Sequence, residues 1–109
     1  MDFQRIDLAR WERREHYLHY MNAVVCSYSL TTELNVTPLS GRRLYPALLW
    51  LLTATVNELP AFRTSLMDGE PVLFSDMHPS YTVFHRQTET FSVLWTEFDR
   101  DYKVFEKAY

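Results

Sequence analysis

Apolar and polar positions alternate regularly between residues 26 and 36. The mainly apolar positions are Cys26, Tyr28, Leu30, Thr32, Leu34 and Val36. The positions between them are all polar, and most of them carry hydroxyl groups. Because successive side chains point to opposite faces of a strand, this pattern predicts a β-strand with one buried face.

The stretch SYTVFHRQTETFSVLW, residues 80–95, predicts two more strands joined by a polar corner. In its second half, Phe91, Val93 and Trp95 share one face. Aromatic side chains dominate protein cores, so packing inside a sheet is the more common origin of such a face. An apolar, aromatic face also suits the wall of a binding pocket, and the pattern alone leaves both interpretations open.

The segment LYPALLWLLTATVNEL, residues 44–59, predicts a helix that is apolar nearly all round. Pro46 falls near its first turn and Pro60 lies just beyond its end, which are the positions where helices accept proline. We therefore expect this helix to be buried on most sides. A short helix over residues 60–66 and a strand over residues 72–76 are expected to follow it.

Two further helices are predicted near the ends of the sequence. Asp7 is expected to cap a helix over residues 8–22, and another begins after residue 97, where Tyr102, Phe105 and Tyr109 form one stripe. The resulting order is helix, strand, helix, a meander of strands, and helix. It predicts an α/β or α+β fold of two layers, in which neighbouring strands are largely antiparallel.

Composition and charge narrow the possible functions. The chain has 109 residues, a hydrophobic content of 47% and a net charge of −3, which suit a small folded domain or part of one. Nothing in this charge directs the chain to nucleic acid or to an anionic membrane. The single cysteine excludes an internal disulfide, and no signal peptide or membrane-spanning run is visible, so a cytoplasmic location is expected.

Two features suggest that the sequence is part of a larger domain. It has only two glycines, fewer than a complete domain of this length usually contains, which indicates that loops are missing. It also stops inside the amphipathic stripe that begins at Tyr102. We expect residues 1–109 to be the amino-terminal part of a single domain.

Candidate catalytic residues are few. His16 and His19 are three residues apart, but no HExxH or CxxC pattern accompanies them, and no metal is expected. His85 stands beside Arg86 and could act as a general base, although polar corner residues more often tether a loop. Cys26 lacks a basic neighbour that would form a thiolate, so it is better interpreted as a small buried side chain.

Four segments together resemble the amino-terminal half of chloramphenicol acetyltransferase. They are WERREHYLHY, CSYSLT, LYPALLWLL and HPSYTVFHRQTETFSVLW, and they occur in the order and with the spacing typical of that family. The resemblance implies a two-layer α/β sandwich with a mixed, largely antiparallel sheet and helices, of which this sequence holds part. It also implies a homotrimer with active sites between subunits.

The resemblance implies an acyltransferase that moves an acetyl group from acetyl-CoA to the primary hydroxyl of chloramphenicol and so confers antibiotic resistance. Acetyl-CoA is the implied co-substrate. In the family a histidine acts as general base and a serine hydroxyl stabilises the oxyanion. The family's HHxxxDG motif, which carries that histidine, does not occur in these 109 residues. The chain alone is therefore expected to be inactive, with no catalytic residue of its own.

The positions that match the family's pocket are assigned by the resemblance alone. Arg13 matches a supporting arginine that pairs with the aspartate of the catalytic motif, and Tyr20 matches an aromatic residue that shapes the acceptor site. The remaining substrate-binding positions are Cys26, Tyr28, Thr82, Phe91 and Val93. Val93 stands where some relatives carry alanine, which would narrow the pocket.

Two alternatives stay open from the sequence. The chain could be an inactive truncated homologue or an assembly protein that keeps part of the fold. It could also be related to the acyltransferase subunits of dehydrogenase complexes, against which the RREH and TVFH strings argue. The segment before Arg42 is shorter than in the family, and the sequence does not explain why.

Overall fold

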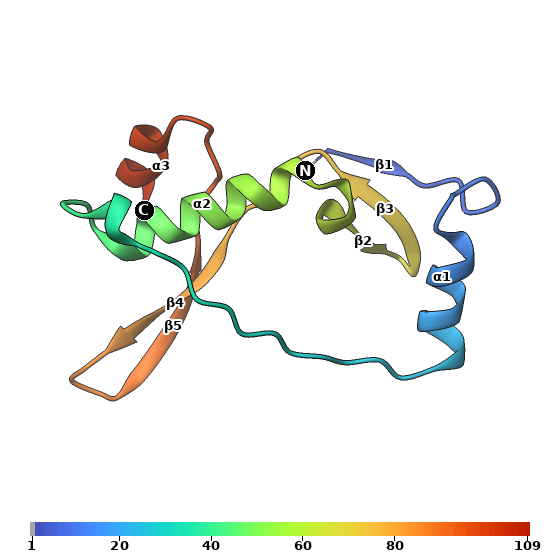
Figure 1. Ribbon diagram of the computed structural model, residues 1–109, viewed down its shortest axis with the longest axis horizontal. Helices are drawn as coiled ribbons and strands as arrows, with labels where there is room; N and C mark the ends of the chain where they lie inside the picture. Colours follow the sequence, from blue (N-terminus) through green and yellow to red (C-terminus); the bar gives the residue numbers. More distant parts are fainter. Residues whose placement is uncertain (1) are drawn as a thin grey trace.

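The computed structural model describes residues 2–109. Its strands form two antiparallel sheets that lie apart from one another (Figure 1). The first sheet has three strands in the order β1 (Phe3–Arg5), β3 (Glu70–Phe74) and β2 (Thr64–Met67). The second is a hairpin of β4 (Ser80–His85) and β5 (Thr90–Trp95). The α/β class with antiparallel neighbours is confirmed.

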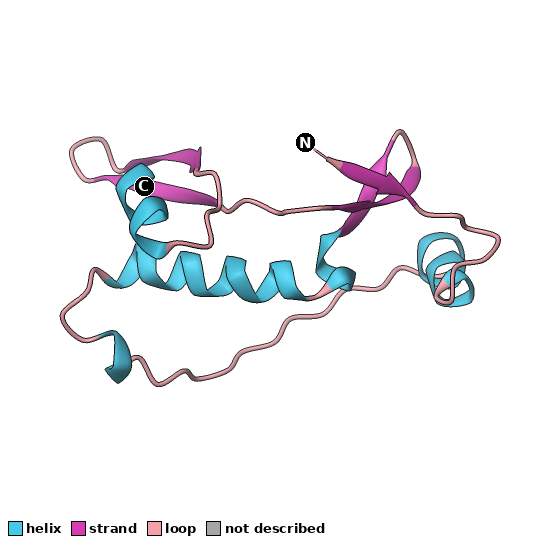
Figure 2. Ribbon diagram, turned by 90° about the horizontal axis from the view of Figure 1, so that it is seen from above, coloured by secondary structure: helices cyan, strands magenta, loops and turns pink. Residues whose placement is uncertain are grey.

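A long helix, α2 (Leu44–Glu58), joins the regions that hold the two sheets. Its predicted limits are confirmed, with Pro46 buried in the first turn and Pro60 opening a 3₁₀ helix, Pro60–Arg63, just after the end. Figure 2 shows the hairpin and α3 (Tyr102–Ala108) next to one end of α2 and the three-stranded sheet beyond the other. The helix therefore sets the distance between the two sheets.

The turn between β2 and β3 follows directly from its sequence. Met67 pairs with Glu70, so Asp68 and Gly69 form a two-residue loop, and both have positive φ values of 53° and 79°. A hairpin loop of this kind requires left-handed backbone at both positions, which Asp-Gly adopts at little cost. Strand β2 replaces the second half of the short helix that the sequence predicts over residues 60–66, because pairing with β3 is available there.

The buried apolar residues are few and lie in separate places. Val72 is buried in the centre of β3, whereas Ala47, Tyr81 and Phe105 lie where α2, the hairpin and α3 meet. Phe105 belongs to the predicted aromatic stripe. The stripe is confirmed, because Phe105 is buried and Tyr102 and Tyr109 are partly buried. The core that forms at this junction fixes the hairpin and α3 to the first half of α2.

Side chains that bond to the main chain tie the connecting loops to this core. The indole of Trp50 donates a hydrogen bond to the carbonyl of Asp99 at 2.8 Å. The imidazole Nδ1 of His78 accepts one from the backbone N–H of Phe98 at 2.9 Å. Such bonds satisfy backbone groups that no sheet or helix reaches.

The predicted strand over residues 26–36 is wrong for this chain. Residues 24–35 follow an extended course but are neither helix nor strand, and every one of them is exposed (Figure 1). The alternation identifies which side chains a sheet would bury, but a strand forms only when a neighbour supplies hydrogen bonds. No such neighbour lies beside the segment within residues 2–109.

The predicted helix over residues 8–22 is shorter than expected. Helix α1 spans Arg14–Leu18, and a π-helical turn, His19–Ala23, extends it. Asp7 does not cap α1, because its carboxylate accepts a hydrogen bond from the N–H of Ala9 at 3.2 Å and so closes a separate turn.

Tyr102 is expected to make the stability of the fold depend on alkaline pH. Burial raises the pKa of Tyr102, and its hydroxyl donates a hydrogen bond to the Glu106 carboxylate at 2.8 Å, which raises the pKa further. Arg42 and Arg43 oppose this shift in part. Because the neutral phenol is favoured in the folded state, its stabilisation is complete below the unfolded pKa of about 10 and is lost as pH rises through the higher folded pKa.

The variant Tyr102→Phe tests this pH dependence, because it removes the hydroxyl but keeps the ring contact with Trp50. We expect the free energy of unfolding of the parent to fall more steeply between pH 9 and 11 than that of the variant, as measured by urea unfolding. The other tyrosines are present in both proteins, so their contributions cancel in the comparison. Parallel pH profiles of the two proteins would contradict the prediction.

Candidate acceptor pocket

Three of the predicted substrate-binding residues share one face of the β4–β5 hairpin. Thr82 pairs directly with Val93 across the two strands, and Phe84 pairs with Phe91. Paired residues of antiparallel strands lie on the same face, so Thr82, Phe91 and Val93 form one continuous surface. Phe91 and Val93 are 65% and 63% exposed, so most of the surface of these two side chains is open to solvent.

The hairpin is attached to the core through its other face and its base. The Tyr81 hydroxyl shares a hydrogen bond of 2.7 Å with the Thr96 hydroxyl, and both residues are buried. The Tyr45 hydroxyl, on α2, donates a hydrogen bond to the Thr82 carbonyl at 3.2 Å. These bonds hold the position of Thr82 while leaving its side chain on the open face.

A second pair of predicted residues lies in a cavity of about 380 Å³ beside α1. Arg13 precedes α1 and Tyr20 lies in the π-helical turn, and both line this cavity. Across it are residues of β2 and β3, including Leu66 and Pro71. Arg13 takes part in none of the ion pairs found among residues 2–109, so its guanidinium is available to a carboxylate from outside the chain.

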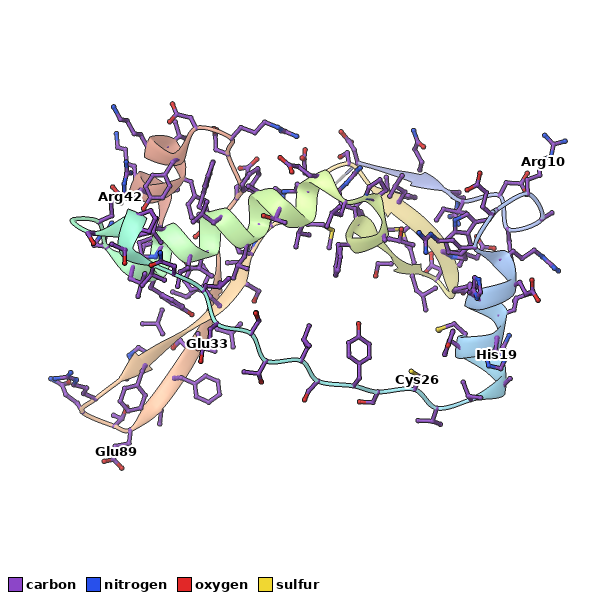
Figure 3. The ribbon with its side chains drawn as sticks, viewed as in Figure 1. Arg10, His19, Cys26, Glu33, Arg42 and Glu89 are labelled. Carbon is purple, nitrogen blue, oxygen red and sulfur yellow. The ribbon has the colours of Figure 1, made fainter. Side chains whose placement is uncertain are left out.

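The last two predicted residues lie on the extended segment. Cys26 is exposed and Tyr28 is 88% exposed, so the interpretation of Cys26 as a buried side chain is wrong for this chain. Figure 3 places Cys26 far along the long axis from Glu89, which marks the tip of the hairpin. The chain therefore holds its candidate pocket residues in three separate groups and does not bring them together.

The four histidines have different surroundings. His85 shares a hydrogen bond of 2.8 Å with the Ser92 hydroxyl on the face of the hairpin opposite Phe91, so its side chain does not point at the acceptor surface. His16 lines the cavity, and the ring of His19 lies 5.1 Å from that of Tyr20. In the part of the chain that the structure describes, no group of three His, Cys, Asp or Glu side chains is placed to hold a metal ion.

The sequence-based reasoning missed several residues of these surfaces. Trp11 and Tyr17 line the α1 cavity with their rings 5.4 Å apart. Six residues separate them, a spacing that does not place two side chains on one face of a helix, so the pattern gave no signal. Phe84 extends the hairpin face beside Phe91. Counting outward from the polar corner of residues 86–89 gives this pairing, because the two strands have equal length.

Comparison with known proteins identifies the family of the chain. The family model described as chloramphenicol acetyltransferase matches residues 1–109. The chain belongs to the chloramphenicol acetyltransferase family, which confirms the resemblance seen in its four sequence segments.

Individual relatives give the extent of the match. A chloramphenicol acetyltransferase from Campylobacter coli is 45% identical over 112 residues, which cover 100% of this chain and 54% of that protein. One from Clostridium perfringens is 44% identical with the same coverage, and chloramphenicol acetyltransferase 2 from Escherichia coli is 40% identical over 115 residues. The chain spans about half the length of the curated relatives it matches.

No helix within residues 2–109 combines the length and the apolar character that crossing a membrane requires.

Proposed function

We propose that this chain supplies the acceptor-binding wall of a chloramphenicol O-acetyltransferase, which transfers an acetyl group from acetyl-CoA to the primary hydroxyl of the antibiotic and so confers resistance. The observation that carries the proposal is the open face of the β4–β5 hairpin, where Phe91 and Val93 remain exposed on a firmly attached element. Family membership over residues 1–109 supplies the reaction class.

The reaction requires a base and an oxyanion site in addition to this wall. The acceptor oxygen attacks the thioester carbonyl as the base removes its proton, and the C–S bond then breaks, so that coenzyme A leaves as a thiol. The family resemblance assigns the base to a histidine in the HHxxxDG motif, which is not part of these 109 residues. His78 and His85 already form hydrogen bonds within the fold, and His85 lies on the face of the hairpin opposite Phe91.

The residues of the wall suit a nitrophenyl acceptor. The Phe91 ring offers an aromatic face for stacking, and Val93 adds apolar surface beside it. Thr82, opposite Val93, supplies a hydroxyl next to this apolar surface. We propose that Tyr20, Cys26 and Tyr28 complete the acceptor site and that Arg13 supports the catalytic motif.

A site formed between subunits explains why the hairpin face and the residues around α1 lie apart within one chain. Within one chain the hairpin face and the α1 cavity lie at opposite ends of the long axis (Figure 1), so one chain cannot place both against a single small molecule. In a homotrimer with interfacial sites, the hairpin of one subunit can face the residues of another. We propose this assembly, in the cytoplasm, without a metal, nucleic acid or membrane partner.

The experiment uses a chimera with the Campylobacter coli relative. The residues of that protein that align with this chain are replaced by residues 1–109, and free thiol release from acetyl-CoA is measured with chloramphenicol present. We expect turnover within about tenfold of the parent, which corresponds to about 1.4 kcal/mol of activation free energy. Residues 1–109 alone should give no turnover, because general-base catalysis is absent.

A matched pair of variants tests the wall. Phe91→Ala in the chimera should lower kcat/KM for chloramphenicol by about 10–100-fold through lost stacking and apolar contact. Phe62→Ala removes a ring of similar exposure, 62%, from the 3₁₀ helix and should leave kcat/KM unchanged. A chimera that assembles without turnover would refute the proposal and indicate a non-catalytic assembly protein, and so would equal effects of the two variants.

A further inference from the structure

The turn that precedes α2 places a positive charge beside α3. The backbone N–H of Arg42 bonds to the Leu39 carbonyl at 3.1 Å. Gly41, just before Arg42, has a positive φ of 86°, which glycine adopts without a steric penalty. The Arg42 guanidinium lies over the ring of Tyr102, 5.6 Å from its centroid. Figure 3 shows Arg42 at the start of α2, next to α3.

A cavity of about 320 Å³ opens beside Arg42. The 3₁₀ helix Thr37–Leu39 forms one of its walls, α2 forms another, and Tyr102 of α3 closes a third side. Arg42 is the only charged member of the described residues that line it. The other lining residues are apolar or aromatic, namely Pro38, Leu39, Ala47, Trp50, Leu51 and Tyr102. An apolar lining with one polar group is typical of a small-molecule site.

Two aromatic rings form a corner of this cavity. The rings of Trp50 and Tyr102 lie 5.7 Å apart at an interplanar angle of 86°. Phe98 stacks on Trp50 at 6.2 Å but does not line the cavity, so part of the Trp50 ring stays open to it. The Trp50 indole already donates its hydrogen bond to the Asp99 carbonyl. The Tyr102 hydroxyl likewise donates to Glu106. The corner therefore offers aromatic surface rather than hydrogen bonds, which suits a ligand ring.

The Arg42 guanidinium supplies the polar group of the cavity. It takes part in none of the ion pairs found among residues 2–109. Glu106 already accepts the hydrogen bond of the Tyr102 hydroxyl and does not line the cavity. A guanidinium that stacks on an aromatic ring can still direct the N–H groups at its edge to a carboxylate, because the two contacts use different parts of the group.

We propose that this cavity binds a small aromatic carboxylate, with the ligand ring against Trp50 and Tyr102 and its carboxylate on Arg42. The volume is at the lower end of the range for ligand sites, so it favours a single ring with a short acidic chain. None of the described residues that line this cavity belongs to the hairpin or to the α1 cavity. Binding here is therefore independent of the proposed acetyl transfer.

The test titrates isotope-labelled residues 1–109 with phenylacetate and follows the indole N–H signals by NMR. The three tryptophans report on different places, because Trp50 lines this cavity, Trp11 lines the α1 cavity and Trp95 lies on the hairpin. We expect phenylacetate to shift the Trp50 signal with a Kd of about 0.1–1 mM and to leave the other two signals in place. If residues 1–109 do not stay in solution alone, the titration is made with the chimera, in which Trp50→Phe identifies the signal.

Two related compounds separate the contributions of charge and ring. Phenylacetamide has the shape of phenylacetate without its charge, and it should bind at least about tenfold more weakly. Cyclohexylacetate keeps the charge but has no aromatic ring, and it should bind at least about threefold more weakly.

Two neighbouring arginines provide the matched variants. Arg42→Gln removes the charge at the cavity and should weaken the binding of phenylacetate at least about tenfold, but that of phenylacetamide less than about threefold. The Arg43 guanidinium lies over the Tyr109 ring and does not line the cavity. Arg43→Gln should therefore change the affinity for phenylacetate less than about threefold. Both arginines are exposed, so both variants should keep the circular dichroism spectrum of the parent.

The ligand site is refuted if phenylacetate does not shift the Trp50 signal, or shifts that of Trp11 or Trp95 equally. It is also refuted if either related compound binds as tightly as phenylacetate, or if the two arginine variants weaken binding equally. Acetyl transfer is judged separately by turnover. An inactive chimera with a Trp50 response refutes the proposed function alone, and an active chimera in which Trp50 does not respond refutes the ligand site alone.

Discussion

Phe105→Ala is expected to lower the free energy of unfolding by about 3–5 kcal/mol, the usual effect of removing a buried aromatic ring. Phe105 has no exposed surface and lies at the junction of α3 with α2 and the hairpin. Few other apolar residues are buried there, so Phe105 supplies a large share of the apolar contact at this junction. Urea unfolding followed by circular dichroism measures the loss.

Two further variants make the result interpretable if Phe105→Ala does not fold. Phe105→Leu fills most of the space and should cost about 1 kcal/mol. Val104→Ala removes a side chain that is 50% exposed on the same helix and should cost well under 1 kcal/mol. Similar losses from Val104→Ala and Phe105→Ala would show that helix propensity, rather than core packing, controls the stability of α3.

Asn57→Ala is expected to lower the free energy of unfolding by about 2 kcal/mol. The Asn57 amide donates a hydrogen bond to the Met77 carbonyl at 3.1 Å and accepts one from the Met77 N–H at 2.7 Å. One side chain thus satisfies both backbone groups of Met77, as a neighbouring strand would do. Removing it leaves both groups without partners in a partly buried place and frees the loop between β3 and β4.

The control for Asn57→Ala comes from the same helix. Thr55 is exposed, and its hydroxyl donates a hydrogen bond only to Leu51 within α2, at 2.9 Å. Thr55→Ala should change the free energy of unfolding by less than about 0.5 kcal/mol. Asn57→Asp keeps the acceptor but loses the donor, and we expect an intermediate loss. Asn57→Ala with no greater effect than Thr55→Ala would contradict the role of the Met77 contact.

The sequence predicts the helices and strands that are determined by patterns within a short segment. Helix α2 is recognisable because Pro46 and Pro60 mark its ends and its residues are apolar throughout. The hairpin is recognisable because a polar corner separates two alternating stretches. Strand β1, by contrast, has only three residues, and its pairing with β3 depends on contacts about 70 residues away, including the Phe3–Phe74 ring contact and the Arg5–Glu70 ion pair.

The candidate site likewise has parts that the sequence predicts and parts that depend on distant contacts. Period two predicts that Phe91 and Val93 share a face, and the structure confirms it. The distance between that face and Tyr20 depends on how α2 separates the two sheets. A pattern within a few neighbouring residues carries no information about this separation. For residues 26–36 the alternation identifies the apolar face, but the sequence cannot show whether a neighbouring strand is present.

The exposed hairpin face also bears on how this protein can evolve. Side chains such as Val93 and Phe91 contribute little to the core of the chain, whereas the bonds that position the hairpin come from Tyr45 and Tyr81. Substitutions at exposed positions usually change folding stability by less than about 0.5 kcal/mol. In the function proposed above, single mutations at Val93 are therefore expected to alter the acceptor preference, with little need for compensating changes elsewhere in the chain.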